Sequence, residues 1–469
     1  MIFILSYTLN KNAHHFELQW HFYLSLAIPN NILYRFKPRI LLLKIEMMKP
    51  KTITQKEKKT VLENFFSLST LQSINYILPV VVLPYLIRVI GPEKFGLIAF
   101  AQALIQYFMI VTDYGFSLSA TRKISLCRSE KGKTCAVFSS VMTVKLILAA
   151  ISFFILLILV HFIPKFREDW LLYLLSFGAV VGNTLFPIWF FQGQEKMKFI
   201  SIINIIGGLI YAISIFIFIK SPKDYLLVPL LNSLFFLITG ILGLYTAFKK
   251  FELKFVLQTY ADIKQELKTD WSIFISIVSI NAYTTTRVFA VGLLTNNILT
   301  GYYAIAERIA NIFQSFPMDS FSQAIYPRLS NIFAKNKKRA FKLMKRLQNS
   351  TTLVFVITIP IAILVSPFIV RIACGLKYPE VILALRLLLI GVFFVAINAF
   401  RVQFLLVCGK PNIYSKIHVT AAIIGLPLIF LSIFYFSYLG AALSTVIIEA
   451  GILIATLRFI RVYKYIRVI

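Results

Sequence analysis

The sequence predicts an all-α, polytopic membrane protein with about twelve transmembrane helices. Hydrophobic residues make up 58% of the 469 positions and charged residues only 14%, whereas a soluble domain averages about 25% charged residues. The mean hydropathy is +0.79. The apolar residues occur in long blocks, and about 20 consecutive apolar residues span the roughly 30 Å hydrocarbon layer as a helix. Composition and block length therefore agree on a bundle of membrane-spanning helices.

The apolar blocks place six spans in each half of the chain. The first six are expected near residues 66–88, 95–116, 136–162, 170–191, 200–219 and 225–247. The second six are expected near residues 271–294, 300–328, 350–371, 380–406, 416–436 and 438–457.

Lys and Arg gather in alternate loops, which gives the orientation. The loop after the second span holds Arg122, Lys123 and Arg128, and the loop after the eighth holds Lys335 and Lys337 among others. Cytoplasmic loops carry such an excess of basic residues. Both termini are also basic, so an even number of spans with both ends in the cytoplasm fits best. The net charge of +30 is explained by this topology, and nucleic acid is not expected as a partner.

The chain divides into two halves with a linker between them. Residues 1–47 contain no clear span, and we interpret them as a disordered tail or a mis-called start. The predicted domains are an N-terminal six-helix lobe (48–248), a cytoplasmic linker (249–270) and a C-terminal six-helix lobe (271–469). Sliding the chain by 206 positions aligns Ser73-Ile74-Asn75 with Ser279-Ile280-Asn281 and Asp113 with Asp319. This match favours two repeats in the same orientation, a pattern that transporters use.

Several chemistries are not expected. The four cysteines are scattered and form no metal-ligand pattern, so no metal and no cofactor are predicted. Gly132-Lys133-Thr134 resembles the end of a phosphate-binding loop, but Cys127 stands where the first glycine is required. Transport energy would then come from an ion gradient or from substrate flux. The loops leave no room for a soluble catalytic domain, so the chain is not expected to be an enzyme.

Charged side chains within the spans are the candidate functional groups, because such residues are costly in the bilayer and usually face a cavity or a partner. Basic groups at this depth would attract phosphates or acidic sugars. Structural ion pairs are the competing interpretation. The candidates for substrate binding are Lys145, Arg287, Arg308, Asn75 and Asn281, and those for ion coupling or gating are Asp113, Glu307, Asp319 and Glu449.

The amide side chains are a weaker signal. Asn75, Asn281, Gln102, Gln106 and Asn183 can hydrogen-bond sugars, although polar contacts between neighbouring helices are the more common role of such residues.

Two segments carry a resemblance to a known family. Residues 83–102 read LPYLIRVIGPEKFGLIAFAQ and residues 112–125 read TDYGFSLSATRKIS. Both resemble the opening of bacterial O-antigen flippases of the Wzx (RfbX) type. Residues 182–199 and 299–316 are similar to later segments of that family, and Asp113-Tyr114-Gly115 and Glu307-Arg308 fall in matching positions.

The resemblance implies the fold of the multidrug/oligosaccharidyl-lipid/polysaccharide exporter superfamily, with two six-helix lobes around a central cavity. It implies a flippase that moves undecaprenyl-pyrophosphate-linked oligosaccharide from the cytoplasmic to the periplasmic leaflet of the bacterial inner membrane by alternating access. Expected partners are the lipid-linked oligosaccharide, the lipid bilayer and other polysaccharide-assembly proteins. An ion-coupled drug exporter of the same fold and a membrane-embedded polysaccharide polymerase are the alternatives. Deep basic residues argue against the first and short loops against the second.

Overall fold

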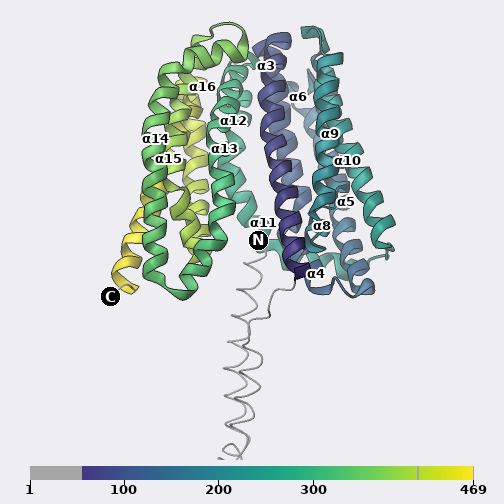
Figure 1. Ribbon diagram of the computed structural model, residues 1–469. Helices are drawn as coiled ribbons and strands as arrows, with labels where there is room; N and C mark the ends of the chain where they lie inside the picture. Colours follow the sequence, from purple (N-terminus) through teal and green to yellow (C-terminus); the bar gives the residue numbers. More distant parts are fainter. Residues whose placement is uncertain (1–54, 409–410, 468–469) are drawn as a thin grey trace, which may run out of the picture. The chain divides into compact units, whose positions relative to one another are not determined.

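The computed structural model describes residues 55–408 and 411–467, and the described residues form helices and no strand (Figure 1). The described residues from Phe66 onward form one compact unit. The helices are α3 (Gln55–Asp113), α4 (Phe116–Cys127), α5 (Lys131–Phe162), α6 (Pro164–Arg167), α7 (Trp170–Leu185), α8 (Ile188–Gly193), α9 (Met197–Phe218), the 3-10 helix η1 (Pro222–Leu226), α10 (Leu227–Phe251), α11 (Tyr260–Thr284), α12 (Thr286–Leu294), α13 (Asn297–Lys335), α14 (Lys337–Cys374), α15 (Pro379–Val407) and α16 (Pro411–Arg467).

The prediction of an all-α, multi-pass membrane protein is confirmed. Among the described residues, eight helices are long and apolar enough to cross a membrane, and α11 with α12 gives a ninth if this pair, bent by 50°, is one span. Two of the eight stretches, Leu78–Cys127 and Ile413–Ile460, contain backbone breaks at Gly91 and Ser437. The number of twelve spans is not confirmed and stays a prediction. The tail at 1–47 lies outside the described residues, and the lobe boundaries also stay predictions.

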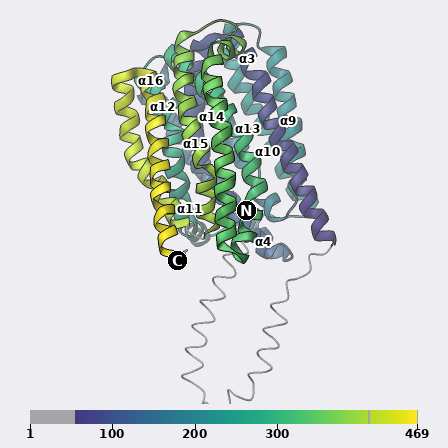
Figure 2. The same cartoon turned by 60° about the vertical axis from the view of Figure 1, so that its left-hand side comes forward.

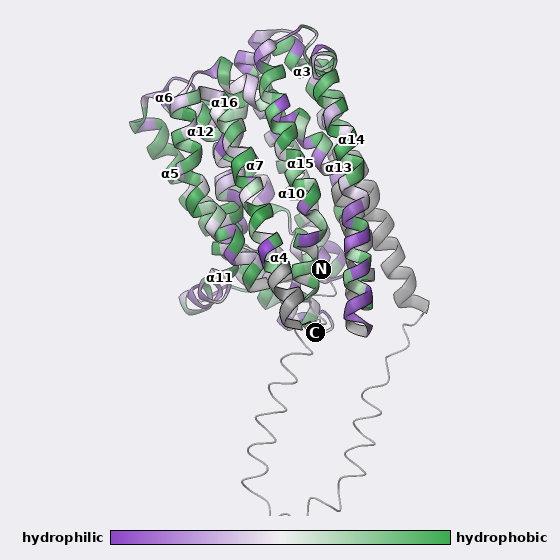
Figure 3. Ribbon diagram, turned by 90° about the vertical axis from the view of Figure 1, so that its left-hand side faces the viewer, coloured by the Kyte–Doolittle hydropathy of each residue, from purple (hydrophilic) through white to green (hydrophobic). Residues whose placement is uncertain are grey.

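The breaks in the long helices have local causes. Gly91 has φ 75°, in the left-handed region that glycine adopts without a steric penalty, and Pro92 follows it. Proline lacks an N–H and fits at the first turn of a helix, so the second part of α3 begins there. Figure 3 shows hydrophobic residues along the helices, and side chains such as Phe154 and Phe434 are exposed on them. These exposed apolar faces are suited to lipid.

The helices pack in two groups that are local in sequence. In the first half α7 packs against α10 and α5, and α10 packs against α9. In the second half α15 lies between α13, α14 and α16, as Figures 1 and 2 both show. Buried residues of α3, α7, α12, α13 and α15 belong to one hydrophobic cluster, so the two groups share a core.

Two glycines bring the halves into backbone contact. A Cβ atom added to Gly96 of α3 would overlap the carbonyl oxygen of Asn297, and one added to Gly301 of α13 would overlap the carbonyl oxygen of Pro92. Only glycine permits this approach of two helices, as in other membrane bundles. Nearby, the ring of Phe100 stacks on Phe289 of α12, with centroids 5.2 Å apart. This contact lies near the loops that are poor in Lys and Arg.

We expect Gly301→Ala to lower the melting temperature of the purified protein in detergent, because the new methyl group must push α13 away from α3. The matched control is Gly451→Ala in α16, where no atom lies within 4 Å of the added Cβ. Replacing a glycine in a helix interior by alanine raises the free energy of unfolding by about 0.5–1 kcal/mol where space allows. The melting temperature of this control should therefore stay unchanged or rise. Equal melting temperatures for the two variants would contradict the close contact.

Candidate functional site

Lys145 of α5 is buried and paired with a carboxylate. Only 2% of its side chain is exposed, and its Nζ lies 3.7 Å from Oδ1 of Asp113 at the end of α3. Asp113 also accepts hydrogen bonds of 3.0 and 2.8 Å from the hydroxyl of Ser117 in α4. A substrate-binding candidate and a gating candidate therefore form one ion pair. In this conformation Lys145 is not available to an incoming anion.

Arg287 of α12 is held in a second polar cluster. Its Nε lies 3.9 Å from Oε1 of Glu307, and it donates a 2.7 Å hydrogen bond to the hydroxyl of Thr445 in α16. Tyr303 donates to the same Glu307 oxygen at 3.3 Å, and Glu449 lies within electrostatic range of Arg287. Three of the predicted charges, from α12, α13 and α16, thus meet inside the second half.

Arg308 has a different environment from these two basic residues. Its side chain is exposed, and it donates a 3.1 Å hydrogen bond to the neutral amide oxygen of Gln102 in α3. Tyr211 of α9, which hydrogen-bonds Asn232 of α10, lies within electrostatic range of the guanidinium. Among the side chains that the structure describes, no carboxylate forms an ion pair with Arg308. The guanidinium therefore keeps donors for an anion.

Arg308 lies about three turns into α13. It lies eleven residues after Asn297, the first residue of α13, which is about 16 Å at 1.5 Å per residue. The hydrocarbon layer is about 30 Å thick. Gln102 lies at a similar distance from Pro92 in α3. Transporters hold substrate near the middle of the bilayer, at the interface between their repeats.

The remaining candidates contribute less. The amide of Asn281 donates to the carbonyl oxygen of Ile277, one turn earlier in its own helix, at 2.9 Å. The side chains of Asn75 and Asp319 lie outside those that the structure describes. No group of three or more His, Cys, Asp or Glu residues able to hold a metal occurs in the described part of the chain.

A polar contact that we did not predict joins the halves at their basic ends. The Nζ atom of Lys123 in α4 lies 2.6 Å from Oε1 of Glu266 and 3.2 Å from Oδ2 of Asp270, both in α11. The hydroxyl of Ser119 donates a 2.8 Å hydrogen bond to the same oxygen of Asp270. The hydroxyl of Tyr114 donates to the carbonyl oxygen of Leu267 at 3.1 Å. The sequence shows Asp270 next to an apolar block, but no spacing rule links it to Lys123, which lies 147 residues away.

The fold and these charged groups define a multi-pass membrane protein of the transporter type. The chain belongs to the polysaccharide biosynthesis protein family, whose model matches residues 61–333. It is 28% identical over 405 residues to the "Putative O-antigen transporter" of Escherichia coli (strain K12), covering 86% of this chain and 97% of that one. A protein of the same description from Shigella dysenteriae is 26% identical over 403 residues, with 85% and 100% covered.

Solved structures show the same fold. The inward closed conformation of the lipid II flippase MurJ superposes with a TM-score of 0.67 at 14% sequence identity, covering 85% of this chain and 87% of that one. An inward-facing multidrug resistance transporter of the MATE family in the MOP superfamily gives 0.66 at 13% identity, covering 86% and 99%. The expected transporter fold and the resemblance to polysaccharide flippases are thereby confirmed.

If Lys145 and Asp113 form a structural pair, then Lys145→Ala should destabilise the protein. The carboxylate of Asp113 would then remain unpaired in a medium of low dielectric constant, which costs about 1–3 kcal/mol of stability. The cost is smaller than for a fully buried pair because Asp113 is partly exposed. The measurement is the melting temperature in detergent. The double variant Lys145→Ala/Asp113→Ala should recover part of the lost melting temperature, because it no longer contains the unpaired carboxylate. A normal melting temperature for Lys145→Ala together with lost transport would instead support the substrate role first predicted for Lys145.

Proposed function

We propose that this protein is a flippase that moves a lipid-pyrophosphate-linked oligosaccharide from the cytoplasmic to the periplasmic leaflet of the bacterial inner membrane. Membership of the polysaccharide biosynthesis family supports this proposal, as do relatives described as O-antigen transporters that the chain matches over nearly their full length. The MurJ-like fold is compatible with a lipid-linked substrate. In this proposal the loops rich in Lys and Arg and both termini lie in the cytoplasm.

The observation that carries the proposal is the environment of Arg308. A cation at mid-bilayer depth is costly unless it faces a partner, a cavity or water. Lys145 and Arg287 have carboxylate partners, whereas among the described side chains the hydrogen-bond acceptor of Arg308 is the neutral Gln102 oxygen. A guanidinium presents a planar fork of donors that matches phosphate oxygens, and the low dielectric constant strengthens the attraction. We assign Arg308 as the contact for the pyrophosphate of the lipid carrier.

Alternating access supplies the movement in this proposal. In the conformation seen here the halves touch near the outer ends through Gly96 and Gly301, and at the basic ends through Lys123 and its two carboxylates. Opening to the periplasm requires separation of the glycine contact, and opening to the cytoplasm requires a change at Lys123. The paired carboxylates Asp113 and Glu307 are the groups whose protonation or release would couple an ion to these changes.

We expect Arg308→Ala to lower surface polysaccharide about tenfold or more in a strain whose only copy carries the variant, because the phosphate loses its charge-assisted hydrogen bonds. Arg308→Lys should retain part of the activity, since lysine keeps the charge but loses the bidentate geometry. Surface polysaccharide is measured by immunoblot of whole cells.

The matched control is Arg371→Ala, which removes an exposed arginine from the last turn of α14. Its surface polysaccharide should remain at the level of the unchanged protein. Membrane abundance is measured for all variants with an epitope tag. Normal polysaccharide in the Arg308→Ala strain would remove Arg308 from the substrate site and with it the main support for the proposal.

A further inference from the structure

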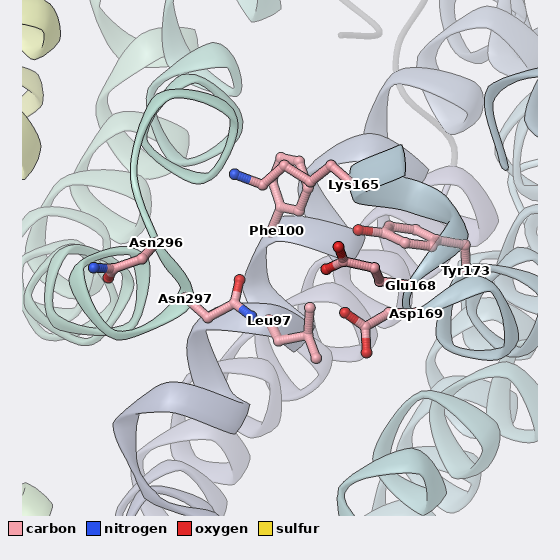
Figure 4. A pocket seen from close by; sticks show the side chains of 8 residues that line it. All are labelled: Leu97, Phe100, Lys165, Glu168, Asp169, Tyr173, Asn296 and Asn297. Atoms are coloured by element: carbon pink, nitrogen blue, oxygen red, sulfur yellow. The ribbon is translucent and has the colours of Figure 1, made fainter. Parts of the chain in front are cut away.

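A small cavity of about 190 Å³ lies at the ends of the helices that adjoin the loops poor in Lys and Arg. Three segments far apart in the sequence line it: Leu97 and Phe100 of α3, the stretch from Lys165 to Tyr173, and Asn296 with Asn297 where α13 begins. Figure 4 shows the carboxylates of Glu168 and Asp169 and the hydroxyl of Tyr173 pointing into the same space, with the side chain of Asn297 on the opposite side. The cavity is smaller than the roughly 300–1,000 Å³ of pockets for drug-sized ligands.

The hydroxyl of Tyr173 has no hydrogen-bond partner, although the residue is fully buried with 0% exposure. Buried polar groups are almost always hydrogen-bonded, and a buried hydroxyl without a partner destabilises the folded state. The ring of Tyr173 is held between two aromatic neighbours, so it cannot easily turn its hydroxyl elsewhere. Its centroid lies 5.2 Å from that of Phe166 and 6.4 Å from that of Phe100. The fold therefore holds an unsatisfied donor and acceptor directly behind the surface of the cavity, and a ligand reaches this hydroxyl after a small shift of the side chains around it.

The charges around the cavity argue against a metal ion. Lys165 lies among the lining residues, and its ammonium donates to the carbonyl oxygens of Leu293 and Thr295 at 3.3 and 3.0 Å. Burial lowers the pKa of Lys165, and Glu168 opposes that shift. Burial raises the pKa of Asp169, while Lys94 opposes the shift and Glu168 adds to it. Two carboxylates beside two ammonium groups leave little net charge for a cation.

The lining instead offers what a hydroxylated ring requires. Carboxylate oxygens accept hydrogen bonds from the hydroxyl groups of a sugar. The side-chain amide of Asn297 and the hydroxyl of Tyr173 can each donate and accept a hydrogen bond. Leu97 and Phe100 supply an apolar wall for the C–H groups of such a ring. Asn296 is not part of this set, because its side chain accepts from the backbone N–H of Leu299 and caps α13.

We propose that this cavity binds one neutral sugar residue at the outer face of the protein. The inference rests on the proposed function in one respect: the natural source of the sugar would be the glycan delivered to that side. A free sugar in the periplasm has the same chemistry, and the experiment separates the two sources.

The test is saturation-transfer NMR on the purified full-length protein in detergent, with D-glucose, D-galactose, D-mannose and N-acetyl-D-glucosamine as probes. We expect transfer to the ring protons of at least one probe. Tyr173→Phe should weaken the binding of that probe about five- to tenfold, because one hydrogen bond is lost. The same substitution should not lower the melting temperature, because the hydroxyl that it removes has no partner in the protein.

Tyr245→Phe is the matched control, since Tyr245 is an exposed tyrosine of α10 beside Lys249, far along the chain from the cavity. It should bind the probe as the unchanged protein does. The proposal is overturned if no probe gives transfer, if Tyr173→Phe binds with unchanged affinity, or if millimolar sodium or calcium chloride displaces the sugar competitively.

A further variant separates this proposal from the proposed function. Arg308→Ala should lower transport of lipid-linked glycan about tenfold or more yet bind the free sugar normally, because Arg308 does not line the cavity. If Tyr173→Phe lowers transport as well as free-sugar binding, the translocated glycan is the source; if transport is unchanged, free sugar is the source. Loss of sugar binding in Arg308→Ala would contradict a separate outer site.

Discussion

The low dielectric constant of the bilayer is the constraint on which the structure depends. A charge placed there needs an opposite charge, water or a ligand. The protein satisfies this requirement within each half, with Lys145 against Asp113 in the first and Arg287 against Glu307 in the second. Arg308 differs from these two residues, since a neutral amide from the other half is its hydrogen-bond acceptor. In the proposed function, that difference separates charges that stabilise the fold from the charge that contacts a phosphate-bearing lipid.

The contacts between the halves differ at their two ends. At the ends that adjoin the loops poor in Lys and Arg, Gly96 and Gly301 bring two backbones together. This contact is lost when the helices separate by a few ångströms. At the basic ends, water can hydrogen-bond the ammonium of Lys123 and the carboxylates of Glu266 and Asp270 when their ion pairs separate. A tight apolar contact at one end and an exchangeable polar one at the other suit two discrete conformations, as alternating access requires.

The sequence predicts the elements better than their partners. Apolar blocks and the Gly91-Pro92 pair place the end of one helix and the start of the next, and the break at Ser437 falls between two predicted spans. Charged residues are rare within the spans, and for this reason the sequence identifies Lys145, Arg287 and Arg308 as candidate substrate-binding residues. Their separate roles depend on which helix lies opposite, and no periodicity within one helix contains that information. The same holds for the cavity at Tyr173, whose walls come from three distant segments.

The most direct measurement is reconstitution of the purified protein into vesicles that carry a labelled undecaprenyl-pyrophosphate-linked oligosaccharide in one leaflet, with proton or sodium gradients imposed in turn. Accessibility of the label to a membrane-impermeant glycosidase reports the leaflet. The account predicts that label reaches the opposite leaflet in vesicles with the unchanged protein and remains in place in protein-free vesicles. Label that stays in its original leaflet under every gradient would contradict the account.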